Sequence, residues 1–149
     1  MASSVVSELV LFIVSLLVAG MVAGGLYVVT QDLSDGIVVK GRAVSTDLRT
    51  DFEIINDPEH IPYASASGSY IFYVRNTGKT SFSFDSNSVV VMIDGNLIPP
   101  ANLTFDPSGS LAPYEVGKIY VQTSLSPGYH KVAVVIETGK QRSLIFKIG

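Results

Sequence analysis

The chain has 149 residues, a length suited to one domain plus an appended segment, and a net charge of −3 with only 15% charged residues. Its ten Lys and Arg are dispersed, which argues against a nucleic acid partner. Cysteine is absent, so disulfides, thiolate metal sites and a cysteine nucleophile are excluded. Hydrophobic residues make up 47% of the chain, and part of this apolar content must lie outside a soluble core.

Residues 9–29 form an uncharged apolar run of about 21 residues, long enough as a helix to cross a hydrocarbon core of roughly 30 Å. A cleaved secretory signal would have a basic start and a shorter run, so we interpret residues 1–30 as a retained transmembrane helix. A prepilin-type cut before the helix would leave this anchor intact. Lys40 and Arg42 follow the run, and the positive-inside rule alone would keep the large domain in the cytoplasm. We instead expect it outside the cell, because of its β-rich character and the resemblance described below.

Three residues of this helix are candidates for assembly. Gly20 and Gly24 form a GxxxG pattern, which lets two helix backbones approach closely. Glu8 lies one residue before the apolar run, where it either sits among lipid headgroups or pairs with a neighbouring chain. The sequence therefore predicts a helix that associates with other helices.

Residues 31–36 are polar and end in glycine, so we expect them to form a linker. Short β-rich runs then recur at the spacing typical of a sandwich. We predict an all-β, immunoglobulin-like β-sandwich over residues 37–149, with hairpins at Asp94-Gly95 and Thr138-Gly139. The candidate strands are residues 37–44, 51–55, 70–75, 81–84, 89–93, 118–123, 130–137 and 143–148.

Two strands have large apolar residues on both faces. Tyr70, Phe72 and Tyr73 belong to the first, residues 70–75, which is either covered on both sides or faces a partner, so these three residues are a candidate partner surface. The second, residues 130–137, is predicted to be central. Prolines make residues 97–113 a long loop or an edge excursion.

No arrangement of residues predicts catalysis. His60 and His130 are the only candidates for a neutral-pH base, and neither has nearby residues at a metal-ligand spacing. There is no nucleophile elbow, P-loop or Rossmann glycine pattern, so we expect no cofactor and no enzymatic activity. Asn102 begins an Asn-Leu-Thr triplet, which is either an N-glycosylation acceptor on an exposed loop or a chance match.

The first 13 residues, MASSVVSELVLFI, and the Ala/Gly-rich half-helix that follows resemble the FlaG family of the archaeal flagellum, the archaellum. The layout of a pilin-like helix joined to a β-sandwich is similar throughout. The resemblance implies a non-catalytic, membrane-anchored stator component that forms homo-oligomers or filaments. It also implies binding to a FlaF-type protein, and through it to the S-layer, outside the cell.

Two other functions fit the same residues. A minor pilin of an adhesion pilus would share the helix but not the motor role. A membrane-anchored extracellular ligand-binding β-sandwich would be monomeric and would use exposed aromatic residues in its loops.

Overall fold

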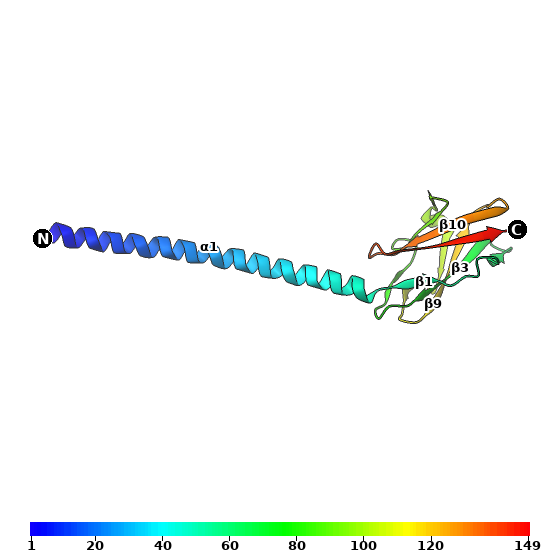
Figure 1. Cartoon of the computed structure of the whole chain (residues 1–149), viewed down its shortest axis with the longest axis horizontal. Coiled ribbons are helices and arrows are strands. Elements are labelled where there is room, and N and C mark those ends of the chain that lie inside the picture. The colour runs from blue at the N-terminus through cyan, green and yellow to red at the C-terminus, as the bar shows by residue number, and fades with distance from the viewer. The chain divides into compact units, whose positions relative to one another are not determined.

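The computed structural model describes residues 1–149, which form two compact units, residues 1–44 and 45–149. From residue 2 onward the first unit is helical and belongs to α1 (Ala2–Arg49), whose last residues, 45–49, belong to the second unit (Figure 1). The predicted end of the helix at residue 30 is therefore wrong. The expected linker 31–36 and the expected strand 37–44 are both helical. Leu33, Ile37 and Val44 recur at helical spacing, and this period prevails over the β-branched composition and over Gly36.

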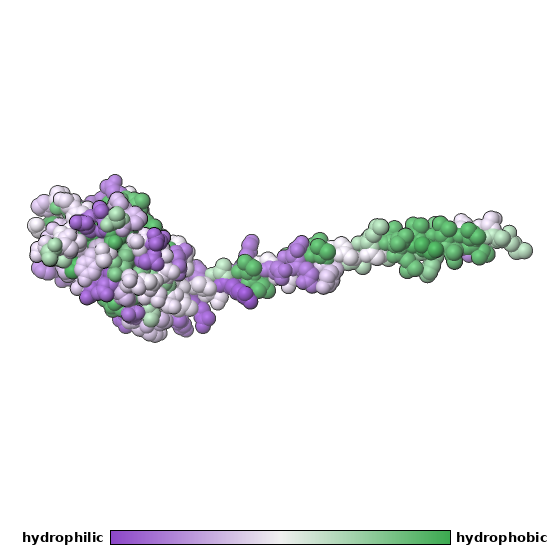
Figure 2. Space-filling view, turned by 180° about the vertical axis from the view of Figure 1, so that it is seen from behind, coloured by the Kyte–Doolittle hydropathy of each residue, from purple (hydrophilic) through white to green (hydrophobic).

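Hydropathy divides α1 into two parts. The first part is almost uniformly apolar and is long and apolar enough to cross a membrane, whereas the part after residue 30 alternates polar and apolar side chains (Figure 2). No side chain of α1 is buried within this chain. At 1.5 Å per residue, the apolar run accounts for about 31 Å of helix and residues 30–49 for about 30 Å more.

The second unit is an antiparallel β-sandwich, as predicted. Its first sheet has the order β1-β3-β9-β7, with β2 also pairing with β3, and its second has the order β11-β10-β5-β6. A small third sheet pairs β4 with β8. The strands are β1 (Phe52–Ile54), β2 (Tyr63–Ala64), β3 (Ser69–Asn76), β4 (Phe82–Phe84), β5 (Val90–Ile93), β6 (Asn96–Leu97), β7 (Leu103–Asp106), β8 (Gly109–Leu111), β9 (Val116–Gln122), β10 (Gly128–Val135) and β11 (Gln141–Ile148), with a 3-10 turn η1 (Pro100–Asn102) before β7.

Side chains that point inward at alternate positions of the strands form the core. Phe72 and Val74 on β3 and Val132 and Val134 on β10 are fully buried; Tyr73 between the first two is only partly covered, whereas Ala133 between the last two is buried on the other face of its sheet. The ring of Phe72 meets that of Phe146 edge-on at 5.3 Å between centroids, which links the two main sheets. The predicted central position of residues 130–137 is confirmed, because β10 lies between β11 and β5.

Both predicted hairpins are present. Asp94 and Gly95 have φ values of 52° and 79° at the β5–β6 turn, the conformation that a tight hairpin requires. Gly139, with φ of 81°, closes the β10–β11 turn. Residues 97–113 are more ordered than expected: they contain β7, an edge strand of the first sheet, and β8, which pairs with β4.

The outer edge of β11 is not free. The amide of Lys147 donates a hydrogen bond to the Pro58 carbonyl at 2.9 Å, and Nε of Arg142 donates to the Phe52 carbonyl at 3.1 Å. The guanidinium of Arg142 also binds the Asp51 carboxylate at 2.7 Å. The segment around β1 therefore covers the edge along which β11 would otherwise accept another strand.

Candidate assembly surfaces

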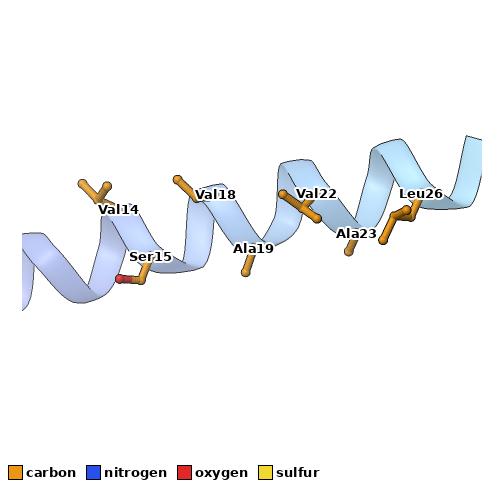
Figure 3. A pocket seen from close by; sticks show the side chains of 7 residues that line it. All are labelled: Val14, Ser15, Val18, Ala19, Val22, Ala23 and Leu26. Atoms are coloured by element: carbon orange, nitrogen blue, oxygen red, sulfur yellow. The ribbon is translucent and has the colours of Figure 1, made fainter.

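A shallow apolar groove runs along one side of α1 within its apolar part. The side chains of Ser15, Ala19 and Ala23 form its floor, and larger aliphatic side chains border it (Figure 3). The lining residues are Val14, Ser15, Val18, Ala19, Val22, Ala23 and Leu26. Small side chains at a spacing of four residues allow close approach of another helix.

The predicted assembly residues lie near this groove without lining it. Gly20 and Gly24 each follow a floor alanine, so they extend the small-residue surface by about 100° around the helix. A Cβ at either glycine would meet no other atom of the chain. Glu8 precedes Ser15 by seven residues, about two turns, and so lies on the same side of α1. All three are exposed within the single chain.

The end of α1 is fixed to the sandwich by a set of contacts that we call the joint: Asp47, Arg49 and Thr50 on the helix side, and Gly78, Lys79 and Lys140 on the strand side. The last carbonyls of a helix have no partner within it and need capping. Here the Lys79 amide donates to the Arg49 carbonyl at 2.7 Å, and Nζ of Lys140 donates to the carbonyls of Asp47 at 3.0 Å and Thr50 at 2.7 Å. A positive charge at the carboxyl end also suits the helix dipole.

Close packing completes the joint. Gly78 donates its amide to the Asp51 carbonyl at 3.0 Å, and a Cβ at Gly78 would lie 2.5 Å from both the Arg49 carbonyl oxygen and the Asp51 nitrogen. The fully buried Asn76 holds this turn, since its Oδ1 accepts from the Gly78 amide and its Nδ2 donates to the carbonyls of Thr80 and Leu111, each at 2.9 Å. No local sequence pattern indicates the joint, because its residues are far apart in the chain.

The candidate partner surface on β3 needs one correction. Phe72 is fully buried in the core and cannot meet a partner. Tyr70 is half-buried, packs against the core and stacks on Tyr63 with 4.9 Å between ring centroids. Only Tyr73 lies on the outer face of the sheet, because alternate residues of a strand point to opposite faces.

Around Tyr73 the outer face of the first sheet combines aromatic, aliphatic and charged side chains, and we call it the tyrosine face. Its apolar part comprises Ile55, Ile71, Tyr73 and Tyr120, with Ile71 directly opposite Tyr120 on the neighbouring strand. Glu53 on β1 lies directly opposite Arg75 at one end of this face, and Lys118 on β9 lies directly opposite Tyr73, with its Nζ 3.6 Å from the Asp106 carboxylate.

The outer face of the second sheet is more apolar, and we call it the aliphatic face. It comprises Val90, Met92, Leu97, Ala133 and Ile145, of which Leu97 and Ile145 are each 63% exposed. The uninterrupted apolar run from Val89 to Ile93 was the available signal for this surface, since a strand with one solvated face usually alternates.

His130 begins β10 and bridges two turns at the end of the sandwich. Its Nδ1 lies 2.6 Å from the Asp94 carboxylate and its Nε2 lies 2.8 Å from the Ser126 carbonyl, so both ring nitrogens face acceptors. The pKa of His130 is raised, mainly by the hydrogen bond to Asp94 and to a smaller extent by the one to Ser126. The hydrogen bond between His130 and Asp94 also lowers the pKa of Asp94. The His130 side chain therefore connects the β5–β6 hairpin to the β9–β10 loop.

The remaining candidate residues lie apart. Asn102 ends the exposed η1 turn, where its side chain is accessible. His60 is exposed in the loop after β1 and has no hydrogen bond from its ring. No group of three or more His, Cys, Asp or Glu side chains is placed to hold a metal ion.

Comparison with known proteins identifies close relatives over nearly the whole chain. The profile of the archaeal-type flagellin family matches residues 2–146. A flagella-related protein G from Methanocaldococcus jannaschii is 41% identical over 145 residues, covering 95% of this chain and 94% of the relative. A flagella-related protein G from Methanococcus voltae is 36% identical over 151 residues, covering 99% of each chain.

Two solved structures from Sulfolobus acidocaldarius are also similar. The archaellum periplasmic stator protein FlaG is 27% identical, with a TM-score of 0.49 over 65% of this chain and 99% of that one. The stator complex of FlaF and FlaG matches with 26% identity and a TM-score of 0.48, over 64% of this chain and 87% of that one.

Proposed function

This chain belongs to the archaeal-type flagellin family, and on that basis we propose that it is a self-assembling stator component of the archaellum. The family is structural and not enzymatic. In this proposal α1 spans the cytoplasmic membrane, the sandwich lies outside the cell, and a FlaF-type protein links it to the S-layer. Two relatives described as flagella-related protein G, aligned over almost their full length, support the archaellum as the setting.

The joint is the observation that carries the mechanical part of the proposal. A stationary part must resist the torque of a rotating filament, so force has to pass between the membrane helix and the sandwich without loss at their connection. A flexible linker would dissipate such force, because a chain without fixed contacts reorients freely. In this chain the helix continues to Arg49, and its final carbonyls are hydrogen-bonded to residues of the β10–β11 and β3–β4 turns.

Assembly in the membrane is assigned to the apolar part of α1. The groove over Ser15, Ala19 and Ala23, widened by Gly20 and Gly24, fits the close approach of another α1 helix. Glu8 lies on the same side and would then contact the neighbouring chain, where a polar partner lowers the cost of placing a carboxylate at the edge of the hydrocarbon.

For the FlaF-type partner we assign the tyrosine face. Tyrosine is enriched at protein interfaces, where its ring contributes apolar area and its hydroxyl a hydrogen bond. The tyrosine face offers two such side chains, Tyr73 and Tyr120, beside the ion pair of Lys118 with Asp106. Partner binding is thus expected to depend on Tyr73 and not on Leu97.

The test uses the full-length chain in detergent, with variants of both faces. Negative-stain images should show oligomers or filaments, and an archaeal lysate should yield a FlaF-type protein and S-layer protein. We expect Tyr73→Ser to lose the FlaF-type partner while Leu97→Ser retains it. Strictly monomeric particles would refute self-assembly, and recovery of pilus components alone would identify a minor pilin instead.

A further inference from the structure

Residues 30–49 of α1 form a helix that needs a neighbour. None of their side chains is buried within the chain. Even the large apolar residues Leu33, Ile37 and Val44 are each 58–63% exposed. This segment also contains Gly36 and Gly41 and several β-branched residues, all of which disfavour helix. Packing against another helix would offset this weak propensity, since most of the stability of protein helices comes from packing of one face.

One side of this segment, which we call the front, is mostly apolar. At 3.6 residues per turn, Leu33, Ile37, Lys40, Val44 and Asp47 fall within about 80° of the helix circumference. A shallow depression lies at the edge of this front, lined by Asp32, Leu33, Gly36, Ile37 and Lys40. Because Gly36 has no side chain, the depression can accept a side chain from another helix.

The opposite side, which we call the back, has a matching set of residues. Asp35, Val38, Val39 and Arg42 lie within about 100° of one another, roughly opposite the front. Both sides carry two charges seven residues apart, but in reversed order. The front has Lys40 followed by Asp47, and the back has Asp35 followed by Arg42.

We propose that residues 30–49 of one copy pack front to back against the same residues of a second copy, in parallel and offset by about five residues. This offset, about 7.5 Å along the axis, brings Lys40 level with Asp35 of the neighbour and Asp47 level with its Arg42. Val44 then lies level with the neighbour's Val39. The two helices are parallel because each continues from a membrane span of the same orientation.

The charges disfavour the simplest alternative, a symmetric pair. Two fronts meeting in register would place Lys40 against Lys40 and Asp47 against Asp47, and like charges in contact repel. A front-to-back contact uses two different surfaces and leaves one of each free, so it propagates into an open assembly. The inference therefore rests on the proposed self-assembly and specifies its geometry.

The absence of cysteine makes crosslinking a clean test. In the full-length chain in membranes, oxidation of the double variant Lys40→Cys with Asp35→Cys should give a ladder of disulfide-linked multimers. Each single variant should remain mostly monomeric. Positions 35 and 40 lie on opposite sides of one helix, so they cannot form a disulfide within a chain. Efficient dimers from Lys40→Cys alone, with no ladder from the double variant, would overturn the proposal.

Charge exchange gives a second test, in which the double variant keeps the net charge of the wild type and the two single variants share the same change in charge. Lys40→Asp should lower the oligomer fraction about two- to fivefold, as expected for loss of one exposed ion pair. The double exchange Lys40→Asp with Asp35→Lys should restore it, whereas Lys131→Asp on the sandwich should have no effect. If the wild-type chain assembles but the double exchange does not restore the oligomer fraction, the front-to-back geometry is overturned and the proposed function is not. A monomeric wild type refutes the proposed function as well.

Discussion

Adding one methyl group at Gly78 should measurably loosen the joint. In Gly78→Ala the new Cβ would lie 2.5 Å from the Arg49 carbonyl oxygen and 2.5 Å from the Asp51 nitrogen. Both are backbone atoms that cannot rotate away, so the turn must shift. Overpacking of this kind costs about 1–3 kcal/mol. Lengthening the hydrogen bonds from Gly78 to Asp51 and from Lys79 to Arg49 adds roughly 0.5–1.5 kcal/mol each. We therefore expect a loss of about 2–6 kcal/mol.

The assay is chemical denaturation of the full-length chain in detergent, followed by the near-ultraviolet circular dichroism of its tyrosines. Gly95→Ala is the matched control. Its Cβ would meet nothing within 4 Å, but Gly95 has a φ of 79°, a conformation that costs other residues roughly 1–2 kcal/mol. If Gly78→Ala destabilised the sandwich no more than Gly95→Ala, the close packing at the end of α1 would not limit stability, and the proposed role of the joint would be refuted.

Lys140→Met should lower the free energy of unfolding by about 1–3 kcal/mol in the same denaturation assay, because two carbonyls at the end of α1 lose a charged donor. The control Lys147→Met should be almost neutral, since it only removes an ammonium near the Tyr129 ring. Asn76→Ala should cost about 2–4 kcal/mol, since it leaves buried backbone groups without partners; a change below 1 kcal/mol would mean that water replaces the side chain. Because the pKa of folded His130 is raised, its stabilising contribution should be complete below the unfolded value of about 6.5 and should disappear as pH rises through the folded pKa. The thermal midpoint should therefore fall between pH 6 and pH 9 in the wild type and change less in His130→Gln, and equal slopes would contradict this.

The sandwich could be predicted because its strands alternate and its turns carry specific residues. Asp94-Gly95 and Thr138-Gly139 identified two hairpins from local chemistry alone, and both exist. The β-branched composition of residues 37–44 predicts a strand, although the helical spacing of Leu33, Ile37 and Val44 continues through them. The glycine at position 36 concealed this continuity, because glycine usually ends a helix but is tolerated within one.

Candidate surface residues were harder to place than strands. Phe72 and Tyr73 are adjacent in sequence, but one is in the core and the other faces outward, and only the sheet pairing decides which. The joint depends on Lys140 reaching Asp47, 93 positions away, which no local pattern encodes. The resemblance to the FlaG family, by contrast, was visible in the first residues, and relatives described as flagella-related protein G confirm it.

The covered edge of β11 limits strand pairing between copies of the sandwich. An open eight-residue strand at high local density invites one sheet to extend into the next, which is the route to irreversible cross-β polymers. The bonds from Lys147 to Pro58 and from Arg142 to Phe52 occupy that edge from within the same chain. Many sandwiches could then stand side by side on a membrane and still separate reversibly, since their longest edge strand would not be available for pairing.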